Sequence, residues 1–217
     1  MKRLIVLAAL FLASVSGFAA PVTIIFTSFN QGLWQLGYPY TANVAGVPGV
    51  AVMCDDWAHG GEPTQTWKAN VTNLGTGNLR LLRFNQLTDA LTLYHEAGWL
   101  LLQAEATPPT DLQDRQDINF AVWWTFDHNT DFGQDPQGPQ GPLSWLAKAN
   151  AEALAGFPGV NFNEVLIYTP LNQYGVDAQG HLDPNAPQEV MQPVPEPATL
   201  ALLAGGLLGL WGRRKLG

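Results

Sequence analysis

The last 24 residues constrain this chain most, because their pattern is typical of a membrane anchor rather than of a packed domain. A Pro-Glu-Pro triplet at 195–197 precedes an uncharged stretch of 14 residues, Ala198 to Trp211, and a basic cluster ends the chain. As a helix the stretch would reach ~21 Å, less than the ~30 Å hydrocarbon core, so it can span only marginally. The prolines keep the triplet extended and accessible, and the basic end favours the cytoplasmic side. The residues concerned are Pro195, Glu196, Pro197, Arg213, Arg214 and Lys215.

This order of motif, apolar span and basic end resembles the PEP-CTERM sorting signal of bacteria that export proteins alongside extracellular polysaccharide. The resemblance implies that a membrane-embedded exosortase recognises residues 193–217 and removes the tail. It also implies only a transient stay in the inner membrane, through a short transmembrane helix. The destination would be the cell surface or the extracellular matrix.

The N-terminus predicts export as well. Lys2 and Arg3 form a positive n-region, Leu4 to Val15 is an apolar h-region, and small residues at 17 and 19 suit signal peptidase. Cleavage is expected after Ala19. The sequence therefore predicts a signal peptide at 1–19 and one extracellular domain at 20–192.

The domain between the two targeting segments is acidic. It keeps five Lys and Arg residues against 17 Asp and Glu, which is a net charge of −12. Nucleic acids and anionic lipids both require clustered Lys and Arg, so neither is an expected partner. Cys54 is the sole cysteine of the sequence, so no internal disulfide can form.

Strand patterns lie near the two ends of the domain and helical patterns lie in its centre. Residues 30–48 are rich in Gly, Pro and Tyr and are interpreted mainly as loop, with a short strand allowed. The order predicts an α+β fold, with an antiparallel sheet or small sandwich packed against two or three central helices. Strands are expected at 22–29, 50–54, 67–72 and 165–168, with another allowed at 189–194, and helices at 84–106, from Asp111 or Asp114 onward, and at 143–154.

Three segments of the domain form a recognisable set. They are Val52-Met53-Cys54-Asp55-Asp56-Trp57, Tyr94-His95-Glu96-Ala97-Gly98-Trp99-Leu100 and Ala121-Val122-Trp123-Trp124-Thr125-Phe126-Asp127. The set resembles a recurrent type of PEP-CTERM protein, for which the resemblance implies no settled biochemical activity.

The first segment, together with Asp117-Ile118-Asn119-Phe120-Ala121-Val122-Trp123-Trp124, more distantly resembles thioester domains of bacterial surface adhesins. In that family a strand cysteine is joined to the glutamine of a Gln-x-Ala-Ile-Trp helix, and an amine on another surface can capture the acyl group. Asn119 stands at the matching position, and Gln116 lies one helical turn earlier. Two interpretations of Cys54 stay open: a thioester-like pair with one of these side chains, or a buried and inert thiol.

Metal sites are suggested only weakly. Asp127, Asn129 and Asp131 are candidate calcium ligands, because oxygen donors alternate as in an EF-hand loop. Gly138, however, stands where that loop needs a bidentate Glu. Cys54, Asp55, Asp56 and His59 are considered for zinc, but no Cys or His pair at metal spacing completes such a site. We therefore predict no metal and no cofactor.

Two further functions follow from side-chain types. A cysteine hydrolase would pair Cys54 with a distant histidine, for which the candidates are His95, His128 and His181. A sugar-binding platform would stack glycans on aromatic rings. Its candidates are Trp34, Tyr38, Tyr40, Trp57 and Trp67.

The sequence thus predicts an exported protein without catalytic residues. We expect a structural or adhesive role in the polysaccharide layer of a biofilm, with Cys54 as the sharper hypothesis for covalent attachment to surface amines. A non-covalent glycan-binding module is the first alternative, with extracellular polysaccharide as its partner, and a Cys-dependent hydrolase is the second.

Overall fold

The computed structural model describes residues 20–28, 37–57, 63–127, 141–171 and 187–194. Within these residues six strands and three α-helices follow one another, with two short 3-10 helices between them. The strands are β1 (Val22–Ser28), β2 (Tyr40–Val44), β3 (Val47–Cys54), β4 (Thr66–Asn73), β5 (Val165–Pro170) and β6 (Val190–Pro193). The helices are η1 (Leu74–Thr76), α2 (Ala90–Ala106), α3 (Leu112–Phe126), α4 (Gly141–Leu154) and η3 (Phe162–Glu164).

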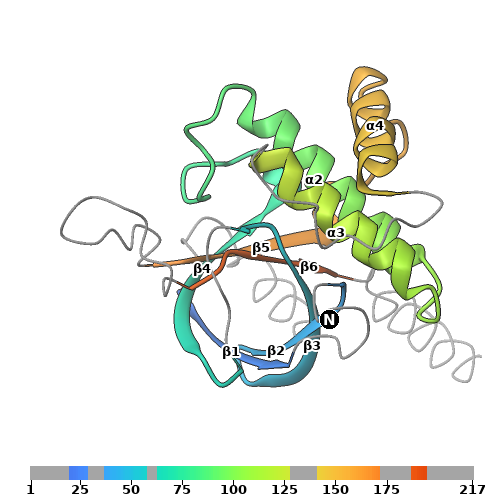
Figure 1. The fold of residues 1–217 in the computed structure, drawn as a ribbon. Coiled ribbons are helices and arrows are strands. Elements are labelled where there is room, and N and C mark those ends of the chain that lie inside the picture. The colour runs from blue at the N-terminus through green and yellow to red at the C-terminus, as the bar shows by residue number, and fades with distance from the viewer. Residues whose placement is uncertain (1–19, 29–36, 58–62, 128–140, 172–186, 195–217) are drawn as a thin grey trace, which may run out of the picture.

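The strands form a closed antiparallel barrel in the order β1-β2-β3-β6-β5-β4, and β4 pairs again with β1 (Figure 1). Ile24 of β1 is opposite Val44 of β2 on one side and opposite Trp67 of β4 on the other. The expected open sheet or small sandwich is therefore wrong, although the central helices and most of the strands were expected.

Closure of the barrel depends on β2 and β6, two strands that the sequence pattern indicates only weakly. β2 lies in the segment interpreted as loop, and β6 has only four residues. Alternation of apolar residues predicts which face of a strand is buried, but it does not predict whether the sheet curls until its edges meet. The sheet closes because β1 pairs with β4 and β3 pairs with β6. Both pairings join residues that are far apart in the chain.

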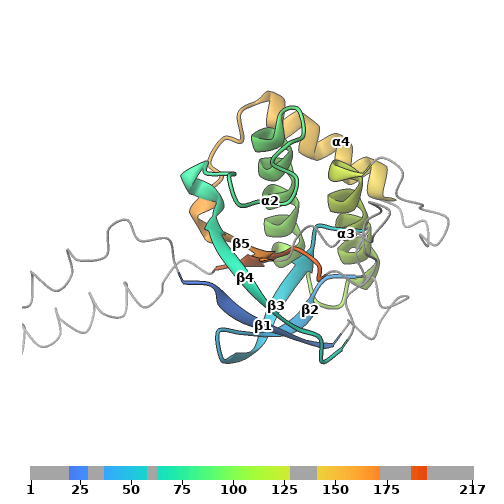
Figure 2. The same cartoon turned by 90° about the vertical axis from the view of Figure 1, so that its left-hand side faces the viewer.

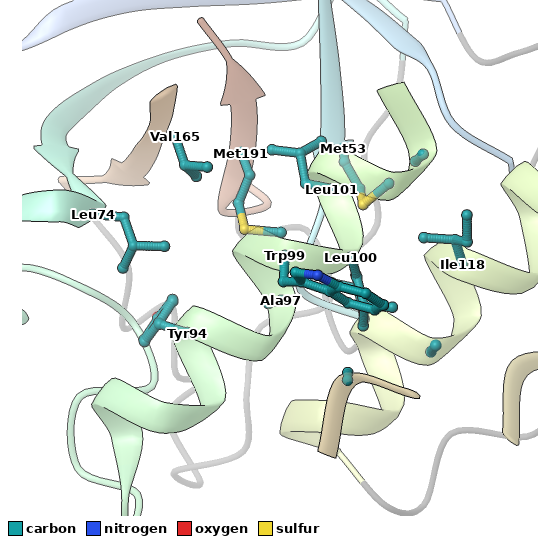
Figure 3. Close-up of a cluster of buried hydrophobic side chains, with 14 of the residues drawn as sticks. Met53, Leu74, Tyr94, Ala97, Trp99, Leu100, Leu101, Ile118, Val165 and Met191 are labelled. Atoms are coloured by element: carbon teal, nitrogen blue, oxygen red, sulfur yellow. The ribbon is translucent and has the colours of Figure 1, made fainter. Parts of the chain in front are cut away.

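The helices gather on one side of the barrel (Figures 1 and 2). They pack on outward-facing side chains of β3, β5 and β6, among them Met53, Ile167 and Met191. Figure 3 shows Met53, Val165 and Met191 close to side chains of α2. We call this layer the outer core, and its largest fully buried members from the helices are Tyr94, Leu100, Leu101 and Ile118.

A second buried cluster fills the barrel, and we call it the inner core. Val52 and Cys54 belong to it, whereas Met53 between them belongs to the outer core, as alternation along β3 requires. Phe120 and Trp123 of α3 join the inner core as well. One face of α3 therefore packs against the inside of the barrel beside the end of β3.

The helix boundaries differ from expectation at one point. The expected start of the first long helix at Phe84 is wrong, because residues 84–89 form turns and α2 begins at Ala90. Phe84 instead stacks on Phe126, and its backbone N–H bonds the Tyr94 hydroxyl at 3.0 Å. Asp111 is confirmed as an N-cap, since its side chain accepts a bond from the Asp114 backbone N–H at 3.2 Å.

Candidate functional site at the barrel mouth

Cys54 ends strand β3 and is fully buried in the inner core. Its Sγ donates to the backbone carbonyl of Asp56 at 3.1 Å, and the Asp56 backbone N–H returns a bond to Sγ at 3.3 Å. These bonds form a tight turn directly after the strand. We call this end of the barrel, where β3 meets α3, the barrel mouth.

The thiol at the barrel mouth is held in its protonated form. Burial raises the pKa of Cys54 well above its ordinary value, and the neighbouring Asp55 carboxyl raises it further. The indole of Trp123 and the guanidinium of Arg83 oppose this rise, but they are smaller influences on the pKa. A protonated thiol is a weak nucleophile, so Cys54 does not have the lowered pKa of a catalytic cysteine.

Helix α3 presents two carboxamides at 0% exposure, those of Gln116 and Asn119. They share a helix face with Phe120 and Trp123, because these positions are three or four residues apart. Neither amide makes a hydrogen bond to any part of the chain that the structure describes. The structure thus brings the predicted face of α3 to the barrel mouth, and it records no bond from either amide to Cys54.

Trp57 lies over this face of α3 and is 37% exposed. Its ring centroid is 4.7 Å from that of Trp123 and 6.2 Å from that of Phe120. Trp123 is itself buried beside the sulfur of Cys54. Trp57 therefore forms the outermost layer of the side chains above the thiol.

Beside Cys54 lies a buried acidic cluster that the sequence did not predict as a unit. Cys54 pairs with Val190, and the same register continued by one residue places Asp55 opposite Glu189. Both side chains have 0% exposure. Burial raises the pKa of Asp55 strongly, and the charge of Glu189 and a hydrogen bond to it add to that rise. Burial beside Glu189 therefore favours the neutral, protonated form of Asp55.

Glu189 is the centre of this cluster. Its Oε1 accepts from the Tyr94 hydroxyl at 2.6 Å, and its Oε2 accepts from the Arg83 backbone N–H at 3.0 Å and from the Thr169 hydroxyl. Together these residues connect α2, β5, β6 and the turns before α2. Only the Asp-Asp pair after Cys54 signalled the cluster in the sequence, since Glu189 and its donors lie far away along the chain.

Asp56 forms the second acidic contact of the cluster. It is paired with the guanidinium of Arg83, and both side chains are almost fully buried, at 1% and 6% exposure. Arg83 Nη2 also donates to the Pro187 carbonyl at 2.7 Å. The pairing explains how Asp56 can enter a protein interior, because a buried charge needs a charged partner and hydrogen bonds.

Most of the aromatic residues predicted as a sugar platform are buried. Tyr38 has 0% exposure and donates its hydroxyl to Glu105 at 2.5 Å. Tyr40 and Trp67 belong to the inner core. Trp34 lies outside the described residues, so Trp57 is the candidate that the structure leaves at the surface.

The metal and hydrolase candidates fall partly outside the described residues. Within the residues that the structure describes, no group of three His, Cys, Asp or Glu side chains is arranged to hold a metal ion. Asp127 is the C-cap of α3, and His95 stacks on Phe162 at 4.1 Å in the helical layer. His95 is thus far from a pairing with Cys54 inside the barrel. The remaining candidates, His59, His128, Asn129, Asp131 and His181, lie outside the described residues.

A groove of about 480 Å³ lies between α2 and the segment that precedes β5. Trp99, Leu102 and Val160 supply its apolar lining. Gln103, Glu105, Asn161 and Glu164 supply polar groups. The groove lies at the outer core, so it is separate from the barrel mouth.

Comparison with known families gives one match, and it lies in the tail. Residues 193–215 match the PEP-CTERM protein-sorting motif. No curated protein and no solved structure matches the chain. Among the residues described here no helix has the length and apolar character that a membrane span requires, and the predicted span from Ala198 to Trp211 lies beyond them. The chain therefore carries a PEP-CTERM sorting signal, which marks it for export and for exosortase processing to the cell surface or extracellular matrix.

Proposed function

We propose that the mature domain is a non-enzymatic, structural and adhesive component of the extracellular polysaccharide layer. In this proposal it attaches covalently, through an acyl link between Cys54 and a carboxamide of α3. The partner side chain is Asn119 or Gln116. The sorting motif supports the extracellular location, and the barrel mouth supports the link.

The observation that carries the proposal is the state of the two carboxamides. Gln116 and Asn119 are both fully buried, and all four of their polar side-chain atoms lack a hydrogen-bond partner in the described chain. Buried polar groups in proteins are almost always bonded, so two such amides on one helix face require an explanation. A link to the Cys54 thiol would remove one amide nitrogen and convert its carbon to an acyl group.

The chemistry balances without a cofactor. The Cys54 sulfur attacks the amide carbon of the partner side chain, the carbon–nitrogen bond breaks, and the thiol proton leaves with the departing ammonia. Asp55, whose raised pKa keeps it protonated, is a neighbouring proton source for the leaving group. Because the pKa of the thiol is also raised, the reaction depends on holding the reacting groups together within the folded mouth.

The surroundings of Cys54 suit a link that survives in water. The sulfur lies in the inner core, and Trp57 and Trp123 cover it. Burial slows hydrolysis, and capture of an amine from another surface then requires movement of the exposed Trp57. A free amine that reaches the acyl carbon would form an amide and release the thiol.

Intact mass of the purified mature domain tests the link. Loss of ammonia lowers the mass by about 17 Da. The folded protein should then resist thiol alkylation and should take up methylamine, which restores an alkylatable thiol. Cys54→Ala should abolish the mass deficit and the methylamine uptake. Of Asn119→Ala and Gln116→Ala, the variant that removes the partner should lose the mass deficit and should leave Cys54 open to alkylation.

Asn150→Ala is the matched control, because Asn150 is an exposed carboxamide on another helix, α4. It should keep the mass deficit of the unaltered domain. A Cys54 that is alkylated freely at the unmodified mass would end the covalent proposal. The coarser role as an exported matrix protein would not be affected by that result.

The groove beside Trp99 favours a second candidate, non-covalent glycan binding. Its apolar lining from Leu102 and Val160 and its amide and carboxylate groups are the kinds of contact that sugar rings need. Titration of the producer's own polysaccharide should change tryptophan fluorescence, and Gln103→Ala and Asn161→Ala should each weaken binding. Gln86→Ala, an exposed amide outside the groove, should bind as the unaltered domain does. Equal affinity in all variants would rule out this groove.

A further inference from the structure

The sorting motif begins inside the folded barrel. The matched residues are 193–215, whereas β6 extends to Pro193. Pro193 lies directly opposite Val165 of β5, and the Val194 backbone N–H donates to the Glu164 carbonyl at 2.7 Å. The first two residues of the motif are therefore held against the start of β5 and the residue that precedes it.

Little chain separates the barrel from the membrane-seeking stretch. Only residues 195–197 lie between Val194 and Ala198. Four fully extended steps of the backbone reach about 14 Å at most. With the apolar stretch in a bilayer, a closed barrel would lie against the membrane surface. An enzyme that cuts near Pro-Glu-Pro has to contact the chain on both sides of the bond that it breaks. On the N-terminal side of that bond, the chain is strand β6.

β6 does not leave the barrel easily. It pairs with both β3 and β5, and Val190 and Met191 are 1% and 0% exposed. Release would open the ring between β3 and β5 and would pull the adjacent Glu189 away from its three donors. Gln192 would also lose the bond that it accepts from the Tyr168 hydroxyl at 2.6 Å. The free energy needed to detach β6 is therefore close to the free energy of global unfolding.

We propose that the exosortase removes the tail before β6 docks, and that the closed barrel is a poor substrate. Processing and barrel closure compete for residues 193 and 194. A chain that closes first keeps its tail and stays at the membrane. The order of events in the exported chain is then cleavage of the tail first and closure of the barrel second.

A cross-link that locks β6 tests this order in the producing cell. Val165→Cys with Pro193→Cys joins two directly opposite positions, in a Cys54→Ala background that prevents mispairing. Disulfides form outside the cytoplasm, so the lock closes after export. The exosortase is withheld while labelled full-length chains are exported and oxidised, so that the lock forms with the tail still present, and it is then induced. Followed by mass, the cross-linked fraction should keep its tail and stay at the membrane.

Two controls separate the lock from its side effects. Val22→Cys with Ala69→Cys links β1 to β4, another directly opposite pair, and should be processed normally. Pro193→Cys alone, which alters the motif without a lock, should also be processed normally. Processing of the Val165–Pro193 cross-linked chain at the rate of the β1–β4 control would overturn the proposal.

A linker provides the second measurement. About ten Gly and Ser residues inserted between Val194 and Pro195 add a mean reach of about 17 Å, which lets the enzyme approach a closed barrel. The cross-linked chain with this linker should regain processing. If it stays tail-bearing although the linker is present, the block does not come from the closeness of barrel and motif, and the proposal is wrong.

Discussion

The outer core and the barrel mouth are both buried, yet they are built in opposite ways. The outer core joins the helices to β3, β5 and β6 with apolar side chains such as Met53, Leu101 and Met191. The mouth, at the end of the same strand β3, buries Asp55 and Glu189 at 0% exposure. Two neighbouring parts of one strand therefore depend on different forces.

The difference teaches where this fold tolerates change. Apolar packing is non-directional, so a truncated side chain in the outer core costs the free energy of the lost contacts and of the cavity. The mouth depends on specific partners, so loss of one group leaves other buried groups without a bond. A single substitution in the mouth should therefore destabilise more than a substitution of similar size in the outer core.

Glu189→Ala should have the largest effect on stability. It leaves the Tyr94 hydroxyl, the Thr169 hydroxyl and the Arg83 backbone N–H without their acceptor. Each orphaned buried group costs roughly 1–3 kcal/mol, so we expect the free energy of unfolding to fall by about 4 kcal/mol. Urea denaturation of the purified domain measures it.

Asp89→Asn is the matched control for a lost carboxylate. Asp89 is exposed and its side chain makes no capping bond to α2. Its free energy of unfolding should change by less than about 0.5 kcal/mol. An effect of Glu189→Ala as small as that of Asp89→Asn would show that the mouth is not held by its polar network.

Leu101→Ala should have the next largest effect. Leu101 is fully buried in the outer core, where Figure 3 shows it near Met53. Leucine-to-alanine changes in cores cost about 3 kcal/mol, and the cavity decides the exact value. Leu154→Ala, at 92% exposure on α4, should be nearly neutral in the same denaturation experiment. A Leu101→Ala cost above that of Glu189→Ala would reverse the comparison between the two regions.

The two regions should also differ in their response to pH. The pKa of Asp55 is raised in the folded state, so its contribution to stability is fully present below the unfolded pKa of ~3.9. That contribution is lost as the pH rises through the folded pKa, with a slope of at most about 1.4 kcal/mol per pH unit. The titrating groups that influence it are Glu189, Tyr94 and Cys54, and Arg83 opposes the rise.

Comparison of Asp55→Asn with the unaltered domain isolates this contribution. The variant has no carboxyl to deprotonate, so its free energy of unfolding should fall less with rising pH. Denaturation at several pH values above 4 measures the difference in slope. Identical slopes for the two proteins would mean that Asp55 is not held protonated. Leu101→Ala, without a titrating group, should lower stability equally at every pH.

The sequence predicted local elements well and their closure badly. The apolar runs at 22–29 and 50–54 and the alternation at 67–72 correspond to β1, β3 and β4, because local burial patterns record which face of a strand is covered. β2 was allowed only as a short strand within a segment interpreted mainly as loop, since Gly, Pro and Tyr near 40 are typical of loops. The ring depends on pairings such as Ile24 with Trp67, which no local pattern contains.

The same limit applies to the site. Cys54, Asn119 and Gln116 were identified from motifs, and the structure buries all three, with Phe120 and Trp123 of the same helix packed in the cluster that holds Cys54. Glu189 gave no signal, because a single glutamate near the end of a domain is normally a solvated residue. Its role depends on the β3–β6 register, which brings it opposite Asp55. Polar residues that function through distant partners are recognised only once the chain is folded.

Tyr168→Phe should have the smallest effect, and it tests whether charge or only bonding separates the two regions. The Tyr168 hydroxyl donates to Gln192 at 2.6 Å, a neutral bond between β5 and β6, so its loss should cost about 1 kcal/mol.

Burial raises the pKa of Tyr168 to about 12. Its contribution is therefore fully present below the unfolded pKa of ~10 and is lost as the pH rises through about 12, so Tyr168→Phe should be less sensitive to alkali than the unaltered domain. If Tyr168→Phe lowered the free energy of unfolding as much as Glu189→Ala does, every bond to β6 would contribute equally. The buried charges would then not be what distinguishes the barrel mouth from the outer core.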